Sequence, residues 1–182
     1  MGTNNGACCP GKNNPVGQAP HHIYRDAALA VAHANAETRA KLRARLVEIP
    51  GGIFEMGARK STFPSDLDSP RAKVKVSSFL ISPHAVTNAD FAEFTADTGY
   101  VTVAEREGWS FVFHLYLNDP KAWPVSPPGL PWWRKVDGAY WAAPRGPDSA
   151  WEDYKDHPAV HITWSDALAY CTWAGLQLPC EA

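Results

Sequence analysis

The sequence predicts an α+β domain with little regular secondary structure, and three observations lead to this class. Apolar segments short enough for strands occur at 47–56 and 74–81. Two T-x-x-D motifs, at Thr87 and Thr163, each precede an amphipathic segment that a glycine closes, which is the pattern of a capped helix. The stretch at 118–158 is rich in proline and tryptophan and predicts a long loop region.

Composition limits the class of protein and of partner. The 182 residues suffice for one domain with a core, and 45% of them are hydrophobic. A formal net charge of −2 gives no field that would attract nucleic acid or an anionic membrane. No apolar run approaches the ~18 residues of a membrane-spanning helix, and the polar N-terminus lacks the apolar stretch of a signal peptide. We therefore expect no nucleic acid, no membrane, a cytoplasmic location of bacterial type and a monomer.

The chain is expected to have three parts. Residues 1–24 begin with many Gly, Asn and Pro residues and are predicted to form a disordered tail. Residues 25–45 are rich in alanine and other strong helix formers, which predicts one marginal helix outside the main core. The domain itself is expected at residues 46–182.

Turn residues and periodicity predict the first elements of this domain. Pro50-Gly51-Gly52 lies between two apolar segments and predicts a hairpin whose turn it forms. A strand at 73–82 changes phase at Ser77-Ser78, which predicts a bulge. A short helix is expected between the Thr87 motif and Gly99.

The later part of the domain is expected to alternate strands with loops. Residues 110–117 and 159–163 are predicted strands, and the loop region between them is expected to hold a hairpin through Val136 and Tyr140. The helix that follows Thr163 places apolar residues at i, i+4 and i+7 on one face, namely Trp164, Leu168 and Cys171.

The residues that could carry chemistry form no complete site in the sequence. His157 and His161 are four apart in a predicted strand, where that spacing spans about 13 Å, so they are expected to pack or hydrogen-bond rather than share a metal ion. Cys171 is expected to be a buried thiol and Cys180 an exposed one. There is no C-x-x-C pair, phosphate-binding loop or nucleophile elbow, and the acidic residues are scattered. Two interpretations stay open: the tryptophan-rich loops bind a peptide or small molecule, or their tryptophans only fill the core.

Several stretches of the sequence resemble the N-terminal half of the formylglycine-generating enzyme, or sulfatase-modifying factor, family. They are VEIPGGIFEMG, SPRAKVKVSSFLISPHAVTNADFAEFTADTGYVTVAEREGWSFVF, PWWRKVDGAYWAAPRGPDS and DHPAVHITWSDALAYCTWAGLQLPCEA. The resemblance implies the formylglycine-generating enzyme or C-type-lectin-like fold. It also implies a truncated chain, because family members continue for a comparable length beyond the motif at Leu178-Pro179.

The resemblance implies an activity as well. Members of the family use O2 and copper(I) to oxidise the cysteine of a C-x-P-x-R motif in a sulfatase to Cα-formylglycine. The thiolates that bind copper and the calcium ligands belong to the other half of the domain, so the resemblance implies no catalytic residue and no metal ligand here. Neither Cys171 nor Cys180 takes the catalytic role, and the chain is expected to be inactive alone.

By resemblance, this half would supply part of the groove for the sulfatase polypeptide. The expected walls of the groove are Trp109, Ser110, Phe111, Trp132 and Trp133. Some members place acidic residues at the positions of Ala85 and Trp109 to contact the substrate arginine, and this sequence has neither. The tail segment Cys8-Cys9-Pro10-Gly11-Lys12 is similar to the substrate motif with Lys for Arg, which leads to the hypothesis of a pseudosubstrate.

Two alternative functions stay open. One is a sulfoxide synthase of the ergothioneine type, which carries a similar domain but needs an upstream helical bundle with a histidine triad, for which residues 1–45 are too short. The other is a non-catalytic C-type-lectin-like protein that binds a peptide or another ligand through the loop region. Two cysteines in the other half of the domain would distinguish the oxidase from a binding protein.

Overall fold

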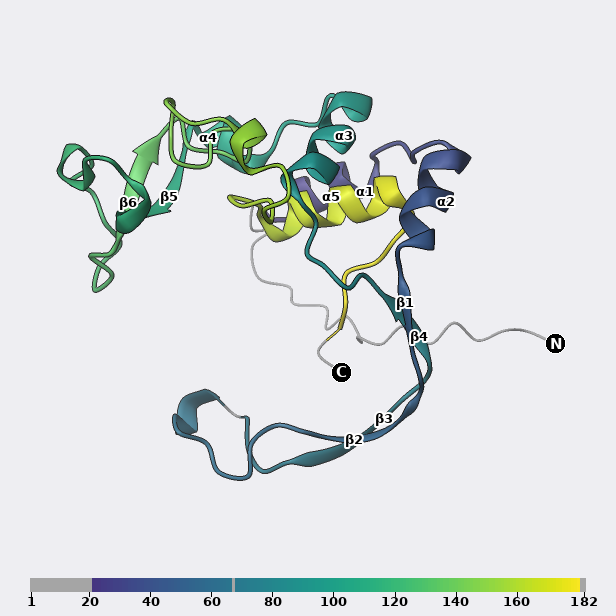
Figure 1. Cartoon of the computed structure of the whole chain (residues 1–182). Helices are drawn as coiled ribbons and strands as arrows, with labels where there is room; N and C mark the ends of the chain where they lie inside the picture. The colour runs from purple at the N-terminus through teal and green to yellow at the C-terminus, as the bar shows by residue number, and fades with distance from the viewer. Residues whose placement is uncertain (1–20, 67, 181–182) are drawn as a thin grey trace. The chain divides into compact units, whose positions relative to one another are not determined.

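The computed structural model of the protein describes residues 21–66 and 68–180, and Figure 1 shows it from one side. These residues form two compact units, one with residues 43–83 and 179–180 and one with residues 21–42 and 84–178. The predicted pseudosubstrate motif and most of the predicted tail lie outside the described residues. Helices and short antiparallel strand pairs both occur, which confirms the α+β class.

The regular elements in the described ranges are short. The α-helices are α1 (His21–Leu29), α2 (Ala36–Ala44), α3 (Asn88–Thr98), α4 (Val103–Glu107) and α5 (Trp164–Ala174). The strands are β1 (Val47–Ile49), β2 (Gly52–Met56), β3 (Ala72–Val76), β4 (Phe79–Ile81), β5 (Trp109–Phe113) and β6 (Trp133–Asp137). Single 3-10 turns are η1 (Pro64–Asp66), η2 (His114–Tyr116), η3 (Pro120–Ala122) and η4 (Trp151–Tyr154). None of the helices described is long and apolar enough to cross a membrane.

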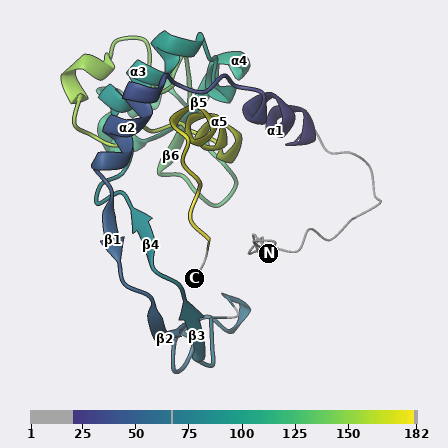
Figure 2. The same ribbon diagram turned by 90° about the vertical axis from the view of Figure 1, so that its right-hand side faces the viewer.

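The unit with residues 43–83 is a long antiparallel ribbon, which Figure 2 shows as two strands that run side by side. β1 pairs with β4 and β2 pairs with β3, so β1 and β2 do not pair with each other. The predicted hairpin at Pro50-Gly51-Gly52 is therefore wrong. The chain continues along the ribbon at this point and reverses only between residues 57 and 71.

Pro50 and Gly51 interrupt the ribbon opposite Ser77 and Ser78. The ladders on either side are separated by two residues on each strand, so the register does not change across the gap. The predicted bulge at Ser77-Ser78 is wrong, because a bulge needs an extra residue on one side only. Pro50 has no N–H to offer a ladder, and a Cβ on Gly51 would lie 2.7 Å from the backbone nitrogen of Ser78. The two residues thus let the strands approach closely rather than reverse the chain.

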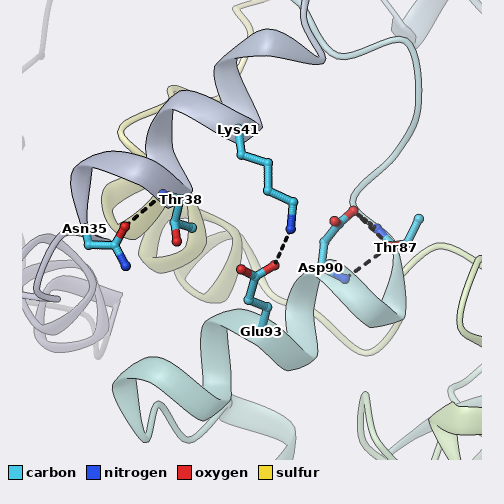
Figure 3. Close-up of polar contacts among 6 residues, drawn as sticks. All are labelled: Asn35, Thr38, Lys41, Thr87, Asp90 and Glu93. Atoms are coloured by element: carbon cyan, nitrogen blue, oxygen red, sulfur yellow. Dashed lines mark hydrogen bonds and ion pairs between the residues drawn. The ribbon is translucent and has the colours of Figure 1, made fainter.

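The alanine-rich segment 25–45 forms two helices, not the single helix outside the core that its composition predicted. Asn35 caps α2, because its Oδ1 accepts a hydrogen bond of 2.8 Å from the backbone N–H of Thr38 (Figure 3). Just before it, the N–H of Ala34 donates to the carbonyl of Trp173 on α5 at 2.8 Å. α1 packs against α5, and one of its alanines is fully buried there. Small side chains allow this close contact, so the segment belongs to the core.

The core of the larger unit is an aromatic cluster between α3 and α5. The ring centroid of Phe94 lies 5.7 Å from that of Tyr170 and 5.5 Å from that of Trp173. Trp141, from the long loop region, packs edge-on against Phe91 with a centroid distance of 5.3 Å. All five side chains are buried, so these two tryptophans fill the core.

The two predicted helix starts are confirmed, and each is a capping box. Thr87 starts α3 and Thr163 starts α5, each exchanges hydrogen bonds with an aspartate three residues later, and a left-handed glycine ends both helices. Figure 3 shows the box of α3. In α5 the aspartate is the fully buried Asp166, whose Oδ1 also accepts from the Tyr100 hydroxyl at 3.0 Å and from the Val103 N–H at 3.1 Å. Asp166 therefore joins the start of α5 to the start of α4.

The predicted apolar face of α5 is confirmed at Leu168 and Cys171, which belong to or pack against the core, but is wrong at Trp164. Trp164 is 59% exposed, whereas Asp166, Ala169 and Tyr170 are buried. The core face of α5 thus combines the aromatic residues Tyr170 and Trp173 with alanines. Cys171 is buried, as predicted.

Strand β5 is shorter than predicted and pairs with β6. The strand predicted at 110–117 ends at Phe113, where the chain turns into η2. The predicted hairpin through Val136 and Tyr140 is wrong, because β6 pairs with β5 instead. Gly138 has a positive φ of 74° and turns the chain away after β6.

The strand predicted at 159–163 does not form. Pro158 makes a single bridge with Thr87, and the extended run then ends at His161, whose φ is 60°. A left-handed residue reverses the direction of the side chains and cannot continue a ladder. The segment consequently forms a loop whose side chains reach toward β5.

Candidate functional site

The β5–β6 pair presents aromatic side chains on one face. Alternation along β5 places Trp109, Phe111 and Phe113 on this face, opposite the buried Val112. Trp133 of β6 pairs with Phe113, and the two ring centroids are 5.6 Å apart in an edge-to-face contact. The short strand pair thereby holds several aromatic rings in fixed positions.

A cavity of about 740 Å³ lies beside β5, within the unit that contains residues 84–178. Four consecutive residues of β5, from Ser110 to Phe113, form one side of it. The start of α3, the start of β6, two 3-10 turns and loop residues form the rest. The polar residues among them include Asn88, Arg145, Tyr154, His157 and His161. No aspartate or glutamate occurs among the described lining residues. A mostly apolar lining with few polar groups suits a peptide segment or a small molecule.

Ser110, His161 and Pro144 form a chain of hydrogen bonds in the cavity wall. The His161 ring nitrogens lie 2.9 Å from the Ser110 hydroxyl (Nδ1) and 2.9 Å from the Pro144 carbonyl (Nε2). A carbonyl only accepts, so Nε2 carries the proton. Burial lowers the pKa of His161, which keeps the ring neutral near pH 7 and leaves Nδ1 as an acceptor. The Ser110 hydroxyl must then donate to Nδ1.

The left-handed backbone conformation of His161 is unfavourable in free energy. For a residue with a Cβ this conformation costs about 1–2 kcal/mol. The two ring hydrogen bonds offset that cost and fix the ring between β5 and the loop at Pro144. This histidine was expected to pack or hydrogen-bond, which is confirmed, although the predicted strand around it is absent.

Arg145 stands between two tyrosine rings at the cavity. Its guanidinium carbon lies 4.6 Å from the ring centroid of Tyr154 and 5.5 Å from that of Tyr116. Such stacking holds the cation in place without neutralising it. Arg145 forms no ion pair with a carboxylate of the described residues, so its charge is available to a ligand.

Asn88 carries a buried acceptor without a donor. Its Nδ2 donates to the carbonyl of Tyr154 at 2.8 Å, which fixes the orientation of the amide because that carbonyl can only accept. The Oδ1 atom has no hydrogen-bond partner among the described residues, and the side chain is only 1% exposed. A buried acceptor left unpaired costs about 1–3 kcal/mol, which a ligand with an N–H group would recover.

The cavity contains three of the five residues expected to form the groove walls. Ser110, Phe111 and Trp133 line it, whereas Trp109 and Trp132 do not. The Trp109 ring instead lies 4.8 Å from the ammonium nitrogen of Lys135, and Trp132 is 43% exposed. A role for any of the five in binding stays a prediction.

The described residues do not fit the copper ion that the resemblance implies. They contain no group of three or more His, Cys, Asp or Glu side chains that could hold a metal ion. Burial raises the pKa of the Cys171 thiol to about 11, so its sulfur stays protonated near pH 7, whereas copper(I) binds thiolates. Cys180 is exposed, as predicted, and belongs to the other compact unit.

Other residues that position the site were not predicted. The start of α4, just before β5, is a capping box in which Glu105 accepts from the Thr102 N–H at 2.8 Å and from the Thr102 hydroxyl at 2.7 Å. The T-x-x-E pattern followed by Gly108 could have revealed it. No local signal marks Asn88, because its hydrogen-bond partner is 66 residues away in the chain.

An aromatic cavity beside a short strand pair has a lining that suits a peptide or a small molecule. The chain belongs to the family of the sulfatase-modifying factor enzyme 1-like domain, which matches residues 32–182.

The relatives of the chain include several formylglycine-generating enzymes. The chain is 51% identical over 144 residues to the formylglycine-generating enzyme of Thermomonospora curvata, across 75% of this chain and 46% of that protein. It is 42% identical over 140 residues to the formylglycine-generating enzyme of Mus musculus, across 76% of this chain and 38% of that protein. The chain thus spans less than half the length of these relatives.

Proteins with other names are also similar to this chain. The inactive C-alpha-formylglycine-generating enzyme 2 of Bos taurus is 41% identical over 138 residues, across 75% of this chain and 46% of that protein. A hercynine oxygenase of Mycolicibacterium smegmatis is 34% identical over 139 residues, across 74% of this chain and 29% of that protein. Similarity to this chain therefore does not separate the relatives named as enzymes from the one named inactive.

Proposed function

We propose that this chain is the N-terminal part of an enzyme that oxidises the cysteine of a C-x-P-x-R motif in a sulfatase to Cα-formylglycine, with O2 as oxidant and copper as cofactor. The family and the relatives named formylglycine-generating enzyme support this function. The whole domain would have the C-type-lectin-like arrangement. The residues described here would bind the sulfatase polypeptide, and the ligands of copper and calcium would lie elsewhere in the protein.

The cavity beside β5 is the observation that carries this proposal. It lies within residues 32–182, which the family matches, and is bordered by Phe111 and Trp133. Aromatic rings held in a groove are the usual surface for an extended segment that contains proline. The C-x-P-x-R motif is such a segment.

The arginine of the motif would bind outside this cavity. The described lining contains no carboxylate and includes the cation Arg145, which would repel a second guanidinium. The cavity would accordingly hold the proline or a flanking part of the sulfatase segment.

The test is to follow the gene beyond the codon of Ala182 and to express the entire encoded protein. With copper and O2 present, the protein should convert the cysteine of a synthetic C-x-P-x-R peptide to an aldehyde, detected by mass spectrometry. A peptide with serine in place of that cysteine and the 182-residue chain alone are the controls. If the entire protein forms no aldehyde, the proposed oxidase activity is overturned.

A second candidate is peptide binding without catalysis. The bovine relative that is named inactive supports it, since its identity to this chain nearly equals that of the mouse enzyme. A stop codon directly after Ala182, together with measurable peptide affinity, would favour this function. The sulfoxide synthase alternative has weaker support, because the hercynine oxygenase is a more distant relative.

A further inference from the structure

The outer edge of β5 is unpaired within the described residues. The His114 N–H donates to the Trp132 carbonyl at 2.8 Å, and the Gly138 N–H donates to the Gly108 carbonyl at 2.8 Å, which fixes the alternation of the β5–β6 ladder. Every second residue of β5 points its backbone N–H and C=O toward β6, starting with Ser110. The residues in between point these groups to the outer edge, namely Trp109, Phe111 and Phe113.

An independent contact on β6 supports this assignment. The Lys135 N–H donates outward to the Val125 carbonyl at 2.8 Å, so the pair of Lys135 and Phe111 is not hydrogen-bonded across the ladder. The outer edge of β6 is thereby occupied. On β5, no described residue hydrogen-bonds to the backbone of Phe111.

The free edge of β5 opens onto the cavity. Side chains of consecutive strand residues alternate between faces, yet all four residues from Ser110 to Phe113 line the cavity, which places it at the edge of the strand. An exposed strand edge with unpaired N–H and C=O groups is a template for another strand. An extended peptide that adds to such an edge gains backbone hydrogen bonds regardless of its side chains.

Two further groups at the cavity indicate which chemical groups a bound peptide would carry. Asn88 Oδ1, buried and without a donor, needs an N–H group. Arg145 marks the end of the cavity near Phe113, because it stacks on Tyr116, whose ring centroid lies 6.2 Å from that of Phe113. With this cation and no described carboxylate in the lining, the cavity favours an acidic side chain at that end.

We propose that an extended peptide with an acidic side chain adds as a strand to the free edge of β5. It exchanges backbone hydrogen bonds with Phe111, donates an N–H to Asn88 Oδ1 and places its carboxylate against Arg145. The proposal rests on the proposed function for the identity of the peptide, a sulfatase segment that contains C-x-P-x-R with a glutamate beside the motif.

The test measures binding of such a synthetic peptide to the 182-residue chain by titration calorimetry. Each backbone nitrogen except that of proline is methylated in turn. A strand faces its partner with every second N–H, so methylation should weaken binding about tenfold at alternate positions and little at the positions between. If methylation weakens binding equally at every position, or at no position, strand addition is overturned and the proposed function is unaffected. If no peptide binds, strand addition is overturned, and the aldehyde assay of the entire encoded protein decides separately on the proposed function.

The backbone N–H of Phe111 can also be removed in the protein itself. Phe111→Pro removes the outward N–H without removing a β5–β6 hydrogen bond, and Phe111→Ala removes only the side chain. Phe111→Pro should bind the peptide about tenfold more weakly than Phe111→Ala does. Equal affinities of the two folded variants would contradict the proposal, and the methylation series decides the question if the proline variant does not fold.

The charge is tested by a double-mutant cycle. Replacing the peptide glutamate by glutamine should weaken binding about threefold to tenfold to the parent chain and not at all to Arg145→Gln. Arg106→Gln is the matched control, because Arg106 also stacks on two tyrosines, Tyr24 and Tyr100, but lies outside the cavity. An equal loss in Arg145→Gln and in the parent chain would rule out the acidic side chain.

Discussion

Nδ1 of His161 accepts a hydrogen bond from the Ser110 hydroxyl at 2.9 Å, although the two residues are 51 positions apart in the sequence. This contact ties a loop to the strand that borders the cavity. It needs a neutral imidazole, because a protonated Nδ1 would no longer accept from the hydroxyl. The wall of the cavity is therefore sensitive to the protonation of one side chain.

The stability of the protein should fall as the pH decreases below about 6.5. Burial lowers the pKa of His161 in the folded state, so the unfolded chain binds this proton first and unfolding becomes easier as the pH falls through the unfolded value of 6.5 toward the lower folded value. His161→Asn, which tolerates the left-handed conformation, should remove this part of the pH dependence.

Urea unfolding at pH 7.5 and 5.5 measures the effect. Ser110→Ala serves as the control, since it keeps the imidazole and its burial and should keep the pH dependence. If His161→Asn loses as much stability between the two pH values as the parent chain does, the buried histidine is not the cause.

Removing the carboxylate of Asp166 should cost far more than removing that of Glu105. Both close a capping box, and the loss of such a box costs about 1 kcal/mol. Asp166 is fully buried and also accepts from Tyr100 and Val103, and those donors would be left unpaired. We expect Asp166→Ala to lower the free energy of unfolding by about 3–5 kcal/mol and Glu105→Ala by about 1 kcal/mol. Comparable losses in chemical denaturation would show that the additional bonds of Asp166 contribute little.

Alanine should be tolerated at Gly52 but not at Gly51. A Cβ at position 51 would lie 2.7 Å from the Ser78 nitrogen and 2.9 Å from the Val76 carbonyl oxygen, while a Cβ at position 52 meets nothing within 4 Å. Gly51→Ala should destabilise the ribbon by about 1–3 kcal/mol through this clash. Gly52→Ala should stabilise its strand by about 0.5 kcal/mol. Hydrogen exchange of the amides of all four ribbon strands, β1 to β4, measures both effects. Equal protection in the two variants would mean that the strands can separate at this point without cost.

Cys171 should react with iodoacetamide much more slowly than Cys180 at pH 8. The reactive species is the thiolate, and burial raises the pKa of Cys171 to about 11, while Cys180 is exposed. Mass spectrometry of the digested protein measures the labelling of each cysteine separately. It also shows whether unfolding the chain in urea makes the two labelling rates equal. Fast labelling of Cys171 in the native protein would mean that α5 opens readily.

The sequence predicted those features of the fold that depend on neighbouring residues. Thr87 and Thr163 each lie within a dozen residues of the aspartate and glycine that complete their helices, so both helices were located correctly. Features that depend on distant partners were missed. The interruption at Pro50 has the composition of a turn, and only the approach of Ser78 to Gly51 shows that two strands continue side by side past this point.

The same distinction holds for the candidate site. The resemblance selected Ser110, Phe111 and Trp133, which line the cavity. Arg145 and Asn88 were not selected, because their significance comes from tyrosine rings and a carbonyl that the fold brings from elsewhere. A pattern of residue types cannot show that a cation lacks a carboxylate or that an amide oxygen lacks a donor.

The adjacent residues Trp132 and Trp133 should differ in their effect on peptide binding. Both were expected to form the groove, but only Trp133 lines the cavity, where its ring packs edge-on to Phe113. Trp133→Ala removes a positioned aromatic contact, which at a binding surface is commonly worth about 2 kcal/mol, so affinity for a C-x-P-x-R peptide should fall by about tenfold or more. Trp132→Ala removes a ring of similar exposure and should leave the affinity unchanged. The two substitutions are chemically identical and one position apart, so a general loss of stability would affect both variants. An equal loss of affinity in two stable variants would instead place the peptide on the outer surface of β6 and not in the cavity.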